Sequence, residues 1–515
     1  MSKSEQLTPI QELYKGKTIF ITGGSGFMGK VLIEKLLYSC SELKQIFLLI
    51  RPKKGKSPES RIEDMFKIPA FQRIKEEKPD VMKKLVPIQG DVTFDKLGLS
   101  GEELERVCRE TNIVFHCAAT LRLEANLKDA LDMNTTGTKR VLDVVREMKN
   151  LLAFIHLSTA FCYCDQEVLL EKVYDCPHDP NDLINCAKWM DVKVLEKITP
   201  EILNPHPNTY TYSKRLAEIL VQNEYPKMPV CIARPSIVSP AWEEPCQGWV
   251  DSLNGPIGIM VGGAKGVIRT MLCNGEYRSE VIPVDIAING LIAIGYKIAT
   301  TQQKPMNIPV YNVTCSDSKK VTWREVLDQG KALNYKYPFE GGLWYPGGDM
   351  TTSKLVHSLK LFFYQLLPAY LIDFIMLCIG QKRFMVRVQK RIYDGLDVLQ
   401  FFTTRQWDFR TERFFGLYNE LTPQDQHIFN MDTDGIPDLE YLKRSILGGR
   451  QYCLKEPLTT LPKARRQLKV LWTIDFIAKI FFYGLFLWAF LSFTGLKQYI
   501  SVLFSESQEG FLKSN

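Results

Sequence analysis

The sequence predicts a doubly wound α/β fold, in which helices cover both faces of a parallel sheet. Over the first 300 residues, short β-branched runs alternate with helical patterns. The runs are continuously apolar, which is typical of strands that are buried on both faces. A glycine-rich turn, TGGSGFMG (22–29), joins the first run to the first helical pattern. At 515 residues the chain is too long for one core, so we expect a further domain.

The expected elements follow one another in a regular order. The strands are TIFIT (18–22), IFLLI (46–50), LVPIQGDV (85–92), NIVFHCAA (112–119), AFIHLSTA (153–160) and VCIARPS (230–236). Helical patterns follow the first, fourth and fifth strands. Insertions at 52–80 and 164–208 interrupt the alternation, which fades beyond about residue 300. We therefore expect an α/β domain over residues 1–300 and a mostly helical domain over 350–460.

Composition and residue spacing exclude several classes of protein. The net charge of +7 is modest and no Cys/His cluster has zinc-finger spacing, so we expect no nucleic-acid partner. The thirteen cysteines form no CxxC pairs and the six histidines have no HExxH spacing, so we expect no metal site. The odd number of cysteines and the polar start, without a secretory signal, favour reduced thiols in the cytosol.

The glycine-rich turn has the spacing of a dinucleotide-binding site. Thr22 ends the first strand, and Gly23, Gly26 and Gly29 have the TGxxGxxG spacing. Gly23 allows a tight turn, Gly26 lets a pyrophosphate approach the backbone, and Gly29 lets the helix pack closely on the strand. Phe27 opens that helix, whose free N–H groups would bind the phosphates. The pattern favours a Rossmann-type dinucleotide site over a simple glycine turn.

The residues after the second strand indicate which dinucleotide binds. An acidic residue there usually accepts a hydrogen bond from the ribose of NAD. This chain has Arg51 at that position, followed by Lys53 and Lys54. A cation suits a 2′-phosphate, so we expect NADPH as the cofactor. The alternative is a solvated basic loop.

Three further residues are assigned to the cofactor site because each lies at the end of an expected strand. Asp91 ends the third strand and can accept a hydrogen bond from the adenine amine. Ala118 is one of the small residues after the fourth strand, where a cofactor can lie close, whereas His116 is interpreted as a packing residue. Pro235 lies in the RPS segment of the sixth strand.

A tyrosine and a lysine share one face of the helical pattern that begins at YTYSK. Tyr210 and Lys214 are four residues apart, and Ser158 and Thr159 end the preceding strand. Ligands of doubly wound sheets bind outside the carboxyl ends of the strands, so these groups can converge over a nicotinamide. We expect Lys214 to lower the pKa of Tyr210 and to hold the ribose. Tyr210 would then donate a proton to a carbonyl, with Thr159 as a second donor.

Several of these segments resemble a known family. TGGSGFMG, LSTAF, YTYSK and IARPSIV resemble the pattern of the extended short-chain dehydrogenases/reductases. A second group of segments is more narrowly similar to the fatty acyl-CoA reductases: GKTIFITGGSGFMGKVLIEKLL, NIVFHCAATLR, WVDSLNGPIGI (249–259) and VIPVDIAING (281–290). The likeness is strong over residues 15–300, and weaker over 350–455, which resembles the helical male-sterility-type C-terminal domain of that family.

The resemblance implies an activity and a set of site residues. Fatty acyl-CoA reductases of this type reduce a long-chain acyl-CoA to the fatty alcohol and CoA with two NADPH, through an enzyme-held aldehyde. Tyr210 and Lys214 would be the catalytic pair, and Thr159 or its neighbour Ser158 the catalytic hydroxyl. The chain departs from the family at Ser239-Pro240, where a Gly-Ala pair is frequent, and this change would reshape the acyl pocket.

A long apolar segment near the C-terminus predicts a transmembrane helix over 472–496, followed by a short tail, 497–515. Residues 480–496 carry no charge, which approaches the length needed to cross hydrocarbon. Four cations precede it, Lys463, Arg465, Arg466 and Lys469, and this asymmetry places the catalytic domain in the cytosol. The alternative is a buried or surface-lying amphipathic helix. The organelle, either endoplasmic reticulum or peroxisome, and a homo-oligomeric state are left open.

A second apolar stretch, Leu361–Gly380, contains Pro368 and Asp373 and is followed by five cations. It fits either a helix in the membrane interface or the core of a helical domain.

Two other functions remain open from the sequence. One is an enzyme of the same superfamily that acts on a sterol or a nucleotide sugar. The other is a non-catalytic, NADP-sensing scaffold at a membrane. Intact Tyr210, Lys214 and Thr159 argue against the scaffold, and the acyl-reductase-like segments argue against the other substrates.

Overall fold

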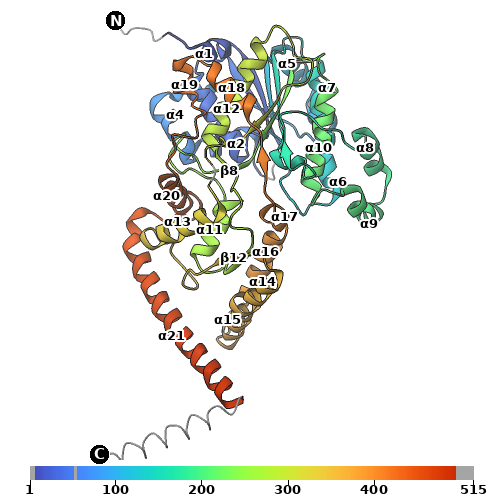
Figure 1. Cartoon of the computed structure of the whole chain (residues 1–515). Helices are drawn as coiled ribbons and strands as arrows, with labels where there is room; N and C mark the ends of the chain where they lie inside the picture. Colours follow the sequence, from blue (N-terminus) through green and yellow to red (C-terminus); the bar gives the residue numbers. More distant parts are fainter. Residues whose placement is uncertain (1–5, 52–54, 320, 494–515) are drawn as a thin grey trace, which may run out of the picture.

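Seven parallel strands form the central sheet of the described chain (Figure 1). The structure is a computed structural model and describes residues 6–51, 55–319 and 321–493. Across the sheet the strands follow the order β11 (Val310–Val313), β7 (Val230–Pro235), β5 (Ala153–Leu157), β4 (Ile113–His116), β1 (Thr18–Thr22), β2 (Gln45–Ile50) and β3 (Leu85–Gln89). The chain reverses direction across the sheet between β1 and β4, where ligands bind in doubly wound folds. The predicted fold class is confirmed.

Helices pack on both faces of this sheet (Figure 1). One face is covered by α1 (Pro9–Tyr14), α2 (Phe27–Ser39), α12 (Val284–Thr300) and α18 (Glu412–Glu420), and the other by α5 (Gly101–Glu110), α7 (Gly137–Arg146) and α10 (Thr209–Gln222). Ile19 and Ile21 of β1 point into the first core, and Phe20 points into the second. Because both faces are buried, the strands read as continuous apolar runs.

Short helices and strands fill the insertions and the connections. The first insertion forms α3 (Pro58–Phe66) and α4 (Gln72–Glu77), and α6 (Leu127–Ala130), α8 (Pro180–Trp189) and α9 (Val192–Leu203) lie near α10. Three pairs of short parallel strands lie outside the main sheet: β8 (Ile237–Ser239) with β10 (Val281–Pro283), β9 (Thr270–Leu272) with β12 (Asp349–Thr351), and β6 (Val168–Leu169) with β13 (Asp408–Phe409). The third expected strand is shorter than predicted, because β3 ends at Gln89 and Asp91 follows it.

The C-terminal half is mostly helical, as expected. Its helices are α11 (Pro256–Ala264), α13 (Trp323–Lys336), α14 (Lys354–Leu361), α15 (Leu367–Cys378), α16 (Met385–Asp397), α17 (Gln400–Thr403), α19 (Pro423–Ile428), α20 (Asp438–Gly448) and α21 (Leu461–Phe493).

Part of this half completes the core of the α/β domain. The seventh strand, β11, lies beyond the boundary that we placed at residue 300. Phe414 of α18 is fully buried in the core beside α12. The carboxylate of Glu171 accepts the backbone N–H groups of Arg413 and Phe414, at 2.6 and 3.3 Å. The two expected domains therefore share a core.

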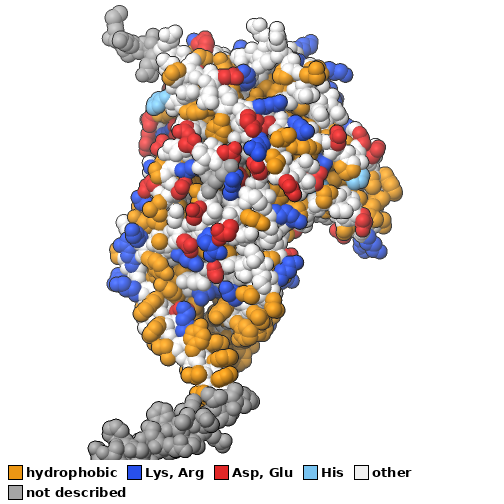
Figure 2. Space-filling model, viewed as in Figure 1, with side chains coloured by type: hydrophobic (Ala, Val, Ile, Leu, Met, Phe, Trp, Pro, Cys, Tyr) orange, Lys and Arg blue, Asp and Glu red, His pale blue; other side chains and the backbone are white. Residues whose placement is uncertain are grey.

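Two helices near the C-terminus are long and apolar enough to cross a membrane, by length and composition alone. They are Lys354–Cys378, which contains α14 and α15, and Leu458–Ser492, which contains most of α21. Hydrophobic side chains gather at this end of the molecule (Figure 2). The expected span 472–496 lies on α21 as far as Phe493, whereas residues 494–496 and the tail 497–515 lie outside the described residues.

Candidate active site

The glycine turn packs against the backbone that follows β4, and no side chain caps the first N–H groups of α2. Gly23 has φ +74°, and a Cβ there would lie 2.6 Å from the amide nitrogen of Ala118. A Cβ on Gly29 would lie 2.5 Å from the Cα of Gly24, whereas one on Gly26 would meet only a carbonyl oxygen at 3.3 Å. Gly26 precedes α2 and no side chain caps its N–H groups. This cradle fits the pyrophosphate of a dinucleotide.

The strand ends beside this turn are joined by buried hydrogen bonds. The Thr22 hydroxyl lies 2.7 Å from Nδ1 of His116 and accepts the N–H of Ala118 at 3.3 Å. The other ring nitrogen of His116 lies 3.0 Å from the Thr138 hydroxyl. Burial, and to a lesser extent the charge of Lys214, lowers the pKa of His116 to about 3. A neutral His116 with both nitrogens bonded is a packing residue, as we expected.

A segment that we did not single out as part of the cofactor site packs against the start of α2. The ring of Trp249 stacks on Phe27 with centroids 5.3 Å apart, and Asp251 accepts a hydrogen bond from Lys30 at 2.8 Å. Phe27 is thus held by a ring contact at the first position of α2. The sequence gives no local signal for this packing, since the partners are more than 200 residues apart.

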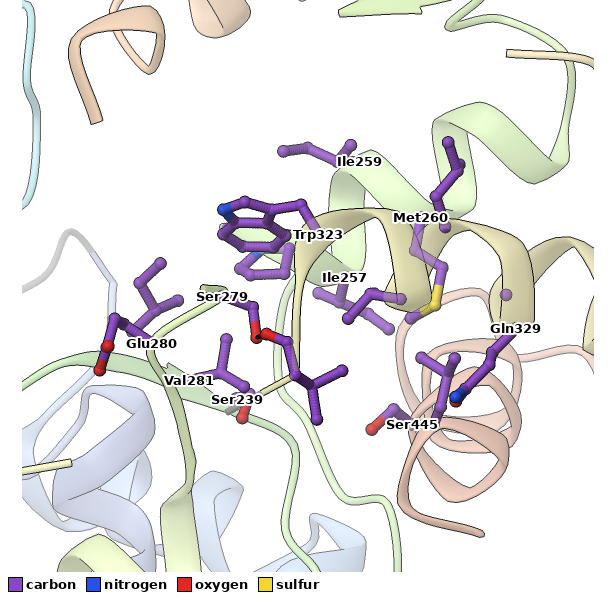
Figure 3. Close-up of a pocket in the computed structure, with 18 of the residues that line it drawn as sticks. Ser239, Ile257, Ile259, Met260, Ser279, Glu280, Val281, Trp323, Gln329 and Ser445 are labelled. Atoms are coloured by element: carbon purple, nitrogen blue, oxygen red, sulfur yellow. Dashed lines mark hydrogen bonds between the residues drawn. The ribbon is translucent and has the colours of Figure 1, made fainter. Parts of the chain in front are cut away.

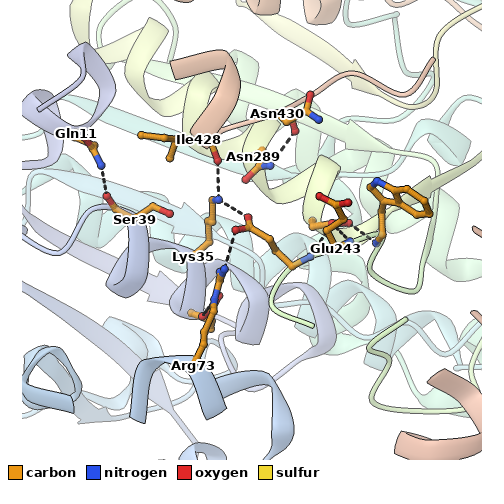
Figure 4. A network of polar contacts seen from close by, with 12 residues as sticks. Gln11, Lys35, Ser39, Arg73, Glu243, Asn289, Ile428 and Asn430 are labelled. Atoms are coloured by element: carbon orange, nitrogen blue, oxygen red, sulfur yellow. Dashed lines mark hydrogen bonds and ion pairs between the residues drawn. The ribbon is translucent and has the colours of Figure 1, made fainter. Parts of the chain in front are cut away.

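A polar network fixes the same segment to the α/β domain (Figure 4). Glu244 pairs with Lys35 of α2, and with Arg73 of α4 at 2.7 Å. Arg73 also binds the fully buried Glu34 through two hydrogen bonds. Asp285 at the start of α12 accepts the backbone N–H groups of residues 242, 243 and 244. These contacts hold the loop that carries Trp249.

Two further predicted cofactor residues lie at the same edge of the sheet: Arg51 follows β2, and Asp91 follows β3. Arg51 is exposed at the end of β2, and its carbonyl oxygen accepts a hydrogen bond from Arg61 of α3 at 2.5 Å. Burial, and to a lesser extent the charge of Arg51, lowers the pKa of Arg61. Sequence reasoning missed Arg61, while Lys53 and Lys54 lie outside the described residues. The carboxylate of Asp91 accepts the N–H of Thr93 at 3.0 Å.

Tyr210 and Thr159 meet at the carboxyl end of β5. Burial and the nearby Cys162 raise the pKa of the Tyr210 phenol, and a hydrogen bond with the Thr159 hydroxyl opposes this shift. Ser158 points elsewhere, because its hydroxyl bonds the Sγ of Cys162 at 3.8 Å and the carboxylate of Glu218. The structure therefore brings Thr159, and not Ser158, to the phenol. Pro235 ends β7, next to β5 in the sheet.

Lys214 lies beneath this pair with 2% of its surface exposed. Its ammonium donates a hydrogen bond to the carbonyl oxygen of Leu157 at 2.7 Å. Burial lowers the pKa of Lys214 to about 8, against a smaller opposing effect of the neighbouring thiols and Glu218. We expected this ammonium to lower the pKa of Tyr210, but burial raises that pKa and Thr159 is the group that opposes the increase.

A buried ion pair packs near the carboxyl end of β5. Arg234 of β7 and Glu218 of α10 are both fully buried, and their closest atoms are 2.6 Å apart. The same carboxylate accepts a hydrogen bond from Cys162 at 3.2 Å. Glu218 therefore links α10, β7 and the residues that follow Thr159. The available sequence signal was an arginine inside the otherwise apolar strand VCIARP.

An apolar cavity of about 360 Å³ lies between the strands β8 and β10 and the C-terminal half (Figure 3). Phe161, whose N–H is donated to the Thr159 hydroxyl at 3.3 Å, lines the cavity together with Ser239 and Pro240. Helices α11, α13 and α20 supply other walls, including Ile257, Trp323 and Ser445, and β12 supplies Met350. Phe161 is thus the lining residue that is bonded directly to the Thr159 hydroxyl.

Comparisons with known proteins define the class of this protein. Two segments, 21–291 and 364–456, match family models that are both described as male sterility protein. The fold is similar to the terminal R domain of the myxalamid PKS-NRPS pathway, with a TM-score of 0.55 and 16% identity over 84% of this chain and 91% of that chain. It is also similar to the reductase (R) domain of a nonribosomal peptide synthetase from Mycobacterium tuberculosis, with a TM-score of 0.57 and 16% identity over 84% and 92% of the two chains. Fold and glycine turn are those of a nicotinamide-dependent oxidoreductase of the short-chain dehydrogenase/reductase type.

Curated relatives narrow this class. The chain is 36% identical to "Fatty acyl-CoA reductase 1" from Homo sapiens over 91% of each chain, and to the protein of that name from Gallus gallus over the same shares. It is 37% identical to "Fatty acyl-CoA reductase 2" from Mus musculus over 92% of this chain and 91% of that one. The chain belongs to the fatty acyl-CoA reductase family.

Proposed function

We propose that this protein reduces a long-chain fatty acyl-CoA to the fatty alcohol and free CoA. The observation that carries the proposal is the position of the apolar cavity. Its wall includes Phe161, which is bonded to Thr159, and Thr159 is bonded to Tyr210. An alkyl chain in the cavity would leave its carbonyl carbon at the polar sheet edge. A sugar nucleotide would leave this apolar volume unfilled.

The reaction takes place in two reductions. In the first, hydride adds to the thioester carbon and a proton adds to its oxygen, which gives a hemithioacetal. The carbon–sulfur bond then breaks, the hydroxyl proton passes to sulfur, and CoA thiol leaves an aldehyde. In the second, hydride and a proton convert the aldehyde to the alcohol. A reduced nicotinamide bound at the glycine turn would supply one hydride, so the two reductions would consume two of them in succession.

Three side chains assist these steps. The raised pKa keeps the Tyr210 phenol protonated, so that it can donate its proton to the developing alkoxide. Thr159 orients the phenol and offers a second hydrogen bond to the same oxygen. The Lys214 ammonium is held against the carbonyl of Leu157 and has further N–H groups for a ribose hydroxyl.

We assign NADPH as the cofactor. The glycine turn would hold the pyrophosphate, and Arg51 with Arg61 would bind a 2′-phosphate. Ala118 and Pro235 would border the nicotinamide, and Asp91 would accept a hydrogen bond from the adenine amine.

We also propose that α21 crosses a membrane and leaves the catalytic domain on the cytosolic side. From Phe476 to Phe490 its large apolar side chains are 50–71% exposed in the described structure. The cations of its first turns, among them Lys463 and Arg466, are exposed on the side of the catalytic domain.

The test is an assay of membranes that carry the full-length chain, with NADPH and palmitoyl-CoA, a sterol or a UDP-sugar offered separately. We expect one CoA thiol for every two NADPH oxidised and a fatty alcohol as the product. Turnover with the sterol or the sugar but not with the thioester would overturn the proposal.

A further inference from the structure

The continuous helix Lys354–Cys378, which contains α14 and α15 and is written α14–α15 below, has a polar stripe that is fixed to the rest of the protein. Gln365, in the π-helical segment Phe362–Leu366 between α14 and α15, accepts the backbone N–H groups of Arg269 and Thr270 at 2.9 and 3.2 Å. His357 of α14 bonds the Thr270 hydroxyl at 3.0 Å. Asp373 of α15 is 6% exposed and accepts three N–H groups at the start of α16, at 2.8–3.0 Å. These contacts anchor α14–α15 to β9 and α16.

The opposite face of α14–α15 is apolar and open. Twelve large apolar side chains on it are 48–71% exposed: Leu355, Leu359, Phe362, Phe363, Tyr364, Leu367, Tyr370, Leu371, Phe374, Ile375, Leu377 and Ile379. Soluble monomers rarely expose a contiguous apolar surface of this extent. The face therefore needs a non-aqueous partner.

The exposed side chains are distributed differently on α14–α15 and on α21. Over Phe476–Phe490, α21 exposes its apolar side chains around its whole circumference, which suits a helix surrounded by lipid. α14–α15 instead has a buried stripe, formed by His357, Gln365, Ala369 and Asp373, that is fixed to β9 and α16. A helix held along one stripe by the rest of the protein suits a position in the plane of a membrane. The length criterion by itself does not distinguish the two cases.

Position and charge favour a lipid surface as the partner. α15 and the far part of α21 lie at the same end of the molecule, away from the central sheet (Figures 1 and 2). Five exposed cations follow α15: Lys382, Arg383, Arg387, Lys390 and Arg391. Within the described residues none of them forms an ion pair. Anionic headgroups would supply their counterions.

We propose that α14–α15 lies in the headgroup region of the leaflet that α21 enters, with its apolar face among the upper acyl chains and the five cations on anionic headgroups. This proposal rests on the proposed anchoring by α21. The cavity wall formed by β12 lies immediately before α14.

Cys378 allows a direct measurement of this depth. It is the exposed one among the thirteen cysteines and ends α15. The full-length protein, labelled there with a polarity-sensitive fluorophore, is reconstituted in phosphatidylcholine vesicles with or without phosphatidylserine. We expect blue-shifted emission and stronger quenching by a nitroxide near the top of the lipid acyl chain than by one at its end. Phosphatidylserine should strengthen both effects.

Two matched probes in a Cys378→Ser background make the result decisive. A probe at Lys149→Cys, exposed on the catalytic domain, should stay unquenched, and one at Trp488→Cys on α21 should be quenched by the deep nitroxide. Water-like emission at Cys378 with a quenched α21 probe would overturn the proposal and leave the anchor intact. Deep quenching at Cys378 would mean a second span. Cross-linking of Cys378 between chains would mean that a second copy covers the face.

A substitution on the exposed face gives an independent check. Leu371→Asp combined with Phe374→Asp should return the Cys378 probe to water-like emission. Both side chains are more than half exposed, so the melting temperature of the protein should not fall. An unchanged blue shift in this variant would contradict the lipid contact.

Discussion

The sheet edge buries charged side chains, whereas the opposite end of the molecule exposes large apolar ones. At the sheet edge, polar groups such as Lys214, Glu218 and Arg234 are almost fully buried, and each has a partner inside the protein. At the far end, Phe374 and Trp488 are 62% and 61% exposed. Burial of a charge is tolerated where the protein supplies the counter-group. Exposure of an aromatic surface is tolerated where the solvent is not water. The charged groups at the sheet edge thus find their partners within the chain, whereas the apolar end needs a partner outside it.

The largest expected effect is at the polar edge. Tyr210→Phe removes the phenol proton, and we expect kcat with palmitoyl-CoA to fall by about 10²–10⁴-fold, the usual range for a general acid. Tyr212→Phe is the matched control: it lies on the same helix, but its hydroxyl bonds His178 at 2.6 Å. Its activity should stay within about twofold. Full activity of Tyr210→Phe would remove the phenol from the mechanism.

The glycine turn should be the next most sensitive place. A methyl group at Gly29 would lie 2.5 Å from backbone, so Gly29→Ala should lower the free energy of unfolding by about 1–3 kcal/mol and weaken NADPH binding. Gly101→Ala, where nothing lies within 4 Å, serves as the control. Thermal melting with and without NADPH measures both effects. Equal melting temperatures for the two variants would show that the turn is not closely packed.

The cavity joins the two regions, and filling it should change the accepted chain length. Gly263 of α11 lines the cavity, with nothing within 4 Å of its Cβ position. Gly263→Leu should lower kcat/KM for stearoyl-CoA about tenfold relative to decanoyl-CoA, the scale of one or more methylene groups in an apolar pocket. Gly101→Leu on the surface should leave that ratio unchanged. An unaltered ratio in Gly263→Leu would place the acyl chain elsewhere.

The pH dependence of the polar edge follows from Lys214. Its pKa of about 8 means that the ammonium is lost as pH rises through 8, so kcat/KM should fall there. Because this pKa is lowered on folding, the unfolded chain binds more protons above pH 8, and the contribution of Lys214 to stability rises with pH. Activity and stability should therefore change in opposite directions. Lys214→Arg should move the fall in activity to higher pH, and a fall at the same pH would assign it to another group.

The smallest effect concerns Arg51, the cation that follows β2. Arg51→Glu should raise the KM for NADPH about tenfold, as expected for one charged hydrogen bond, and should leave the KM for NADH unchanged. Lys67→Glu in the same region, where the side chain is 70% exposed, is the control. Equal effects on both cofactors would show that Arg51 does not bind a 2′-phosphate.

Local sequence patterns were sufficient for six strands of the sheet, but not for β11 at its edge. Buried parallel strands are continuous apolar runs, and the carboxyl ends of such strands meet at one edge. This rule predicted that Thr159 and Tyr210 lie together at the end of β5, as the structure shows. Their roles in catalysis stay a prediction, as does the preference for NADPH.

Contacts between distant segments could not be predicted in the same way. Arg61 contacts Arg51 from within the first insertion, whose packing the sequence did not predict, and Trp249 contacts Phe27 from more than 200 residues away. The sequence pattern also did not predict which group the Lys214 ammonium binds. Helical spacing places it on the face of Tyr210, but the carbonyl of Leu157 draws it to the strand below.

The contact between α18 and α12 has a consequence for synthesis of the chain. The ribosome releases α12 long before α18, and until then the buried position of Phe414 against Gly290 is vacant. The nascent α/β domain thus carries an uncovered apolar stripe while α14 and α15 emerge with one of their own. Until α18 has folded back, both stripes are open to aggregation, and a chain that ended before α18 would leave the first one permanently uncovered.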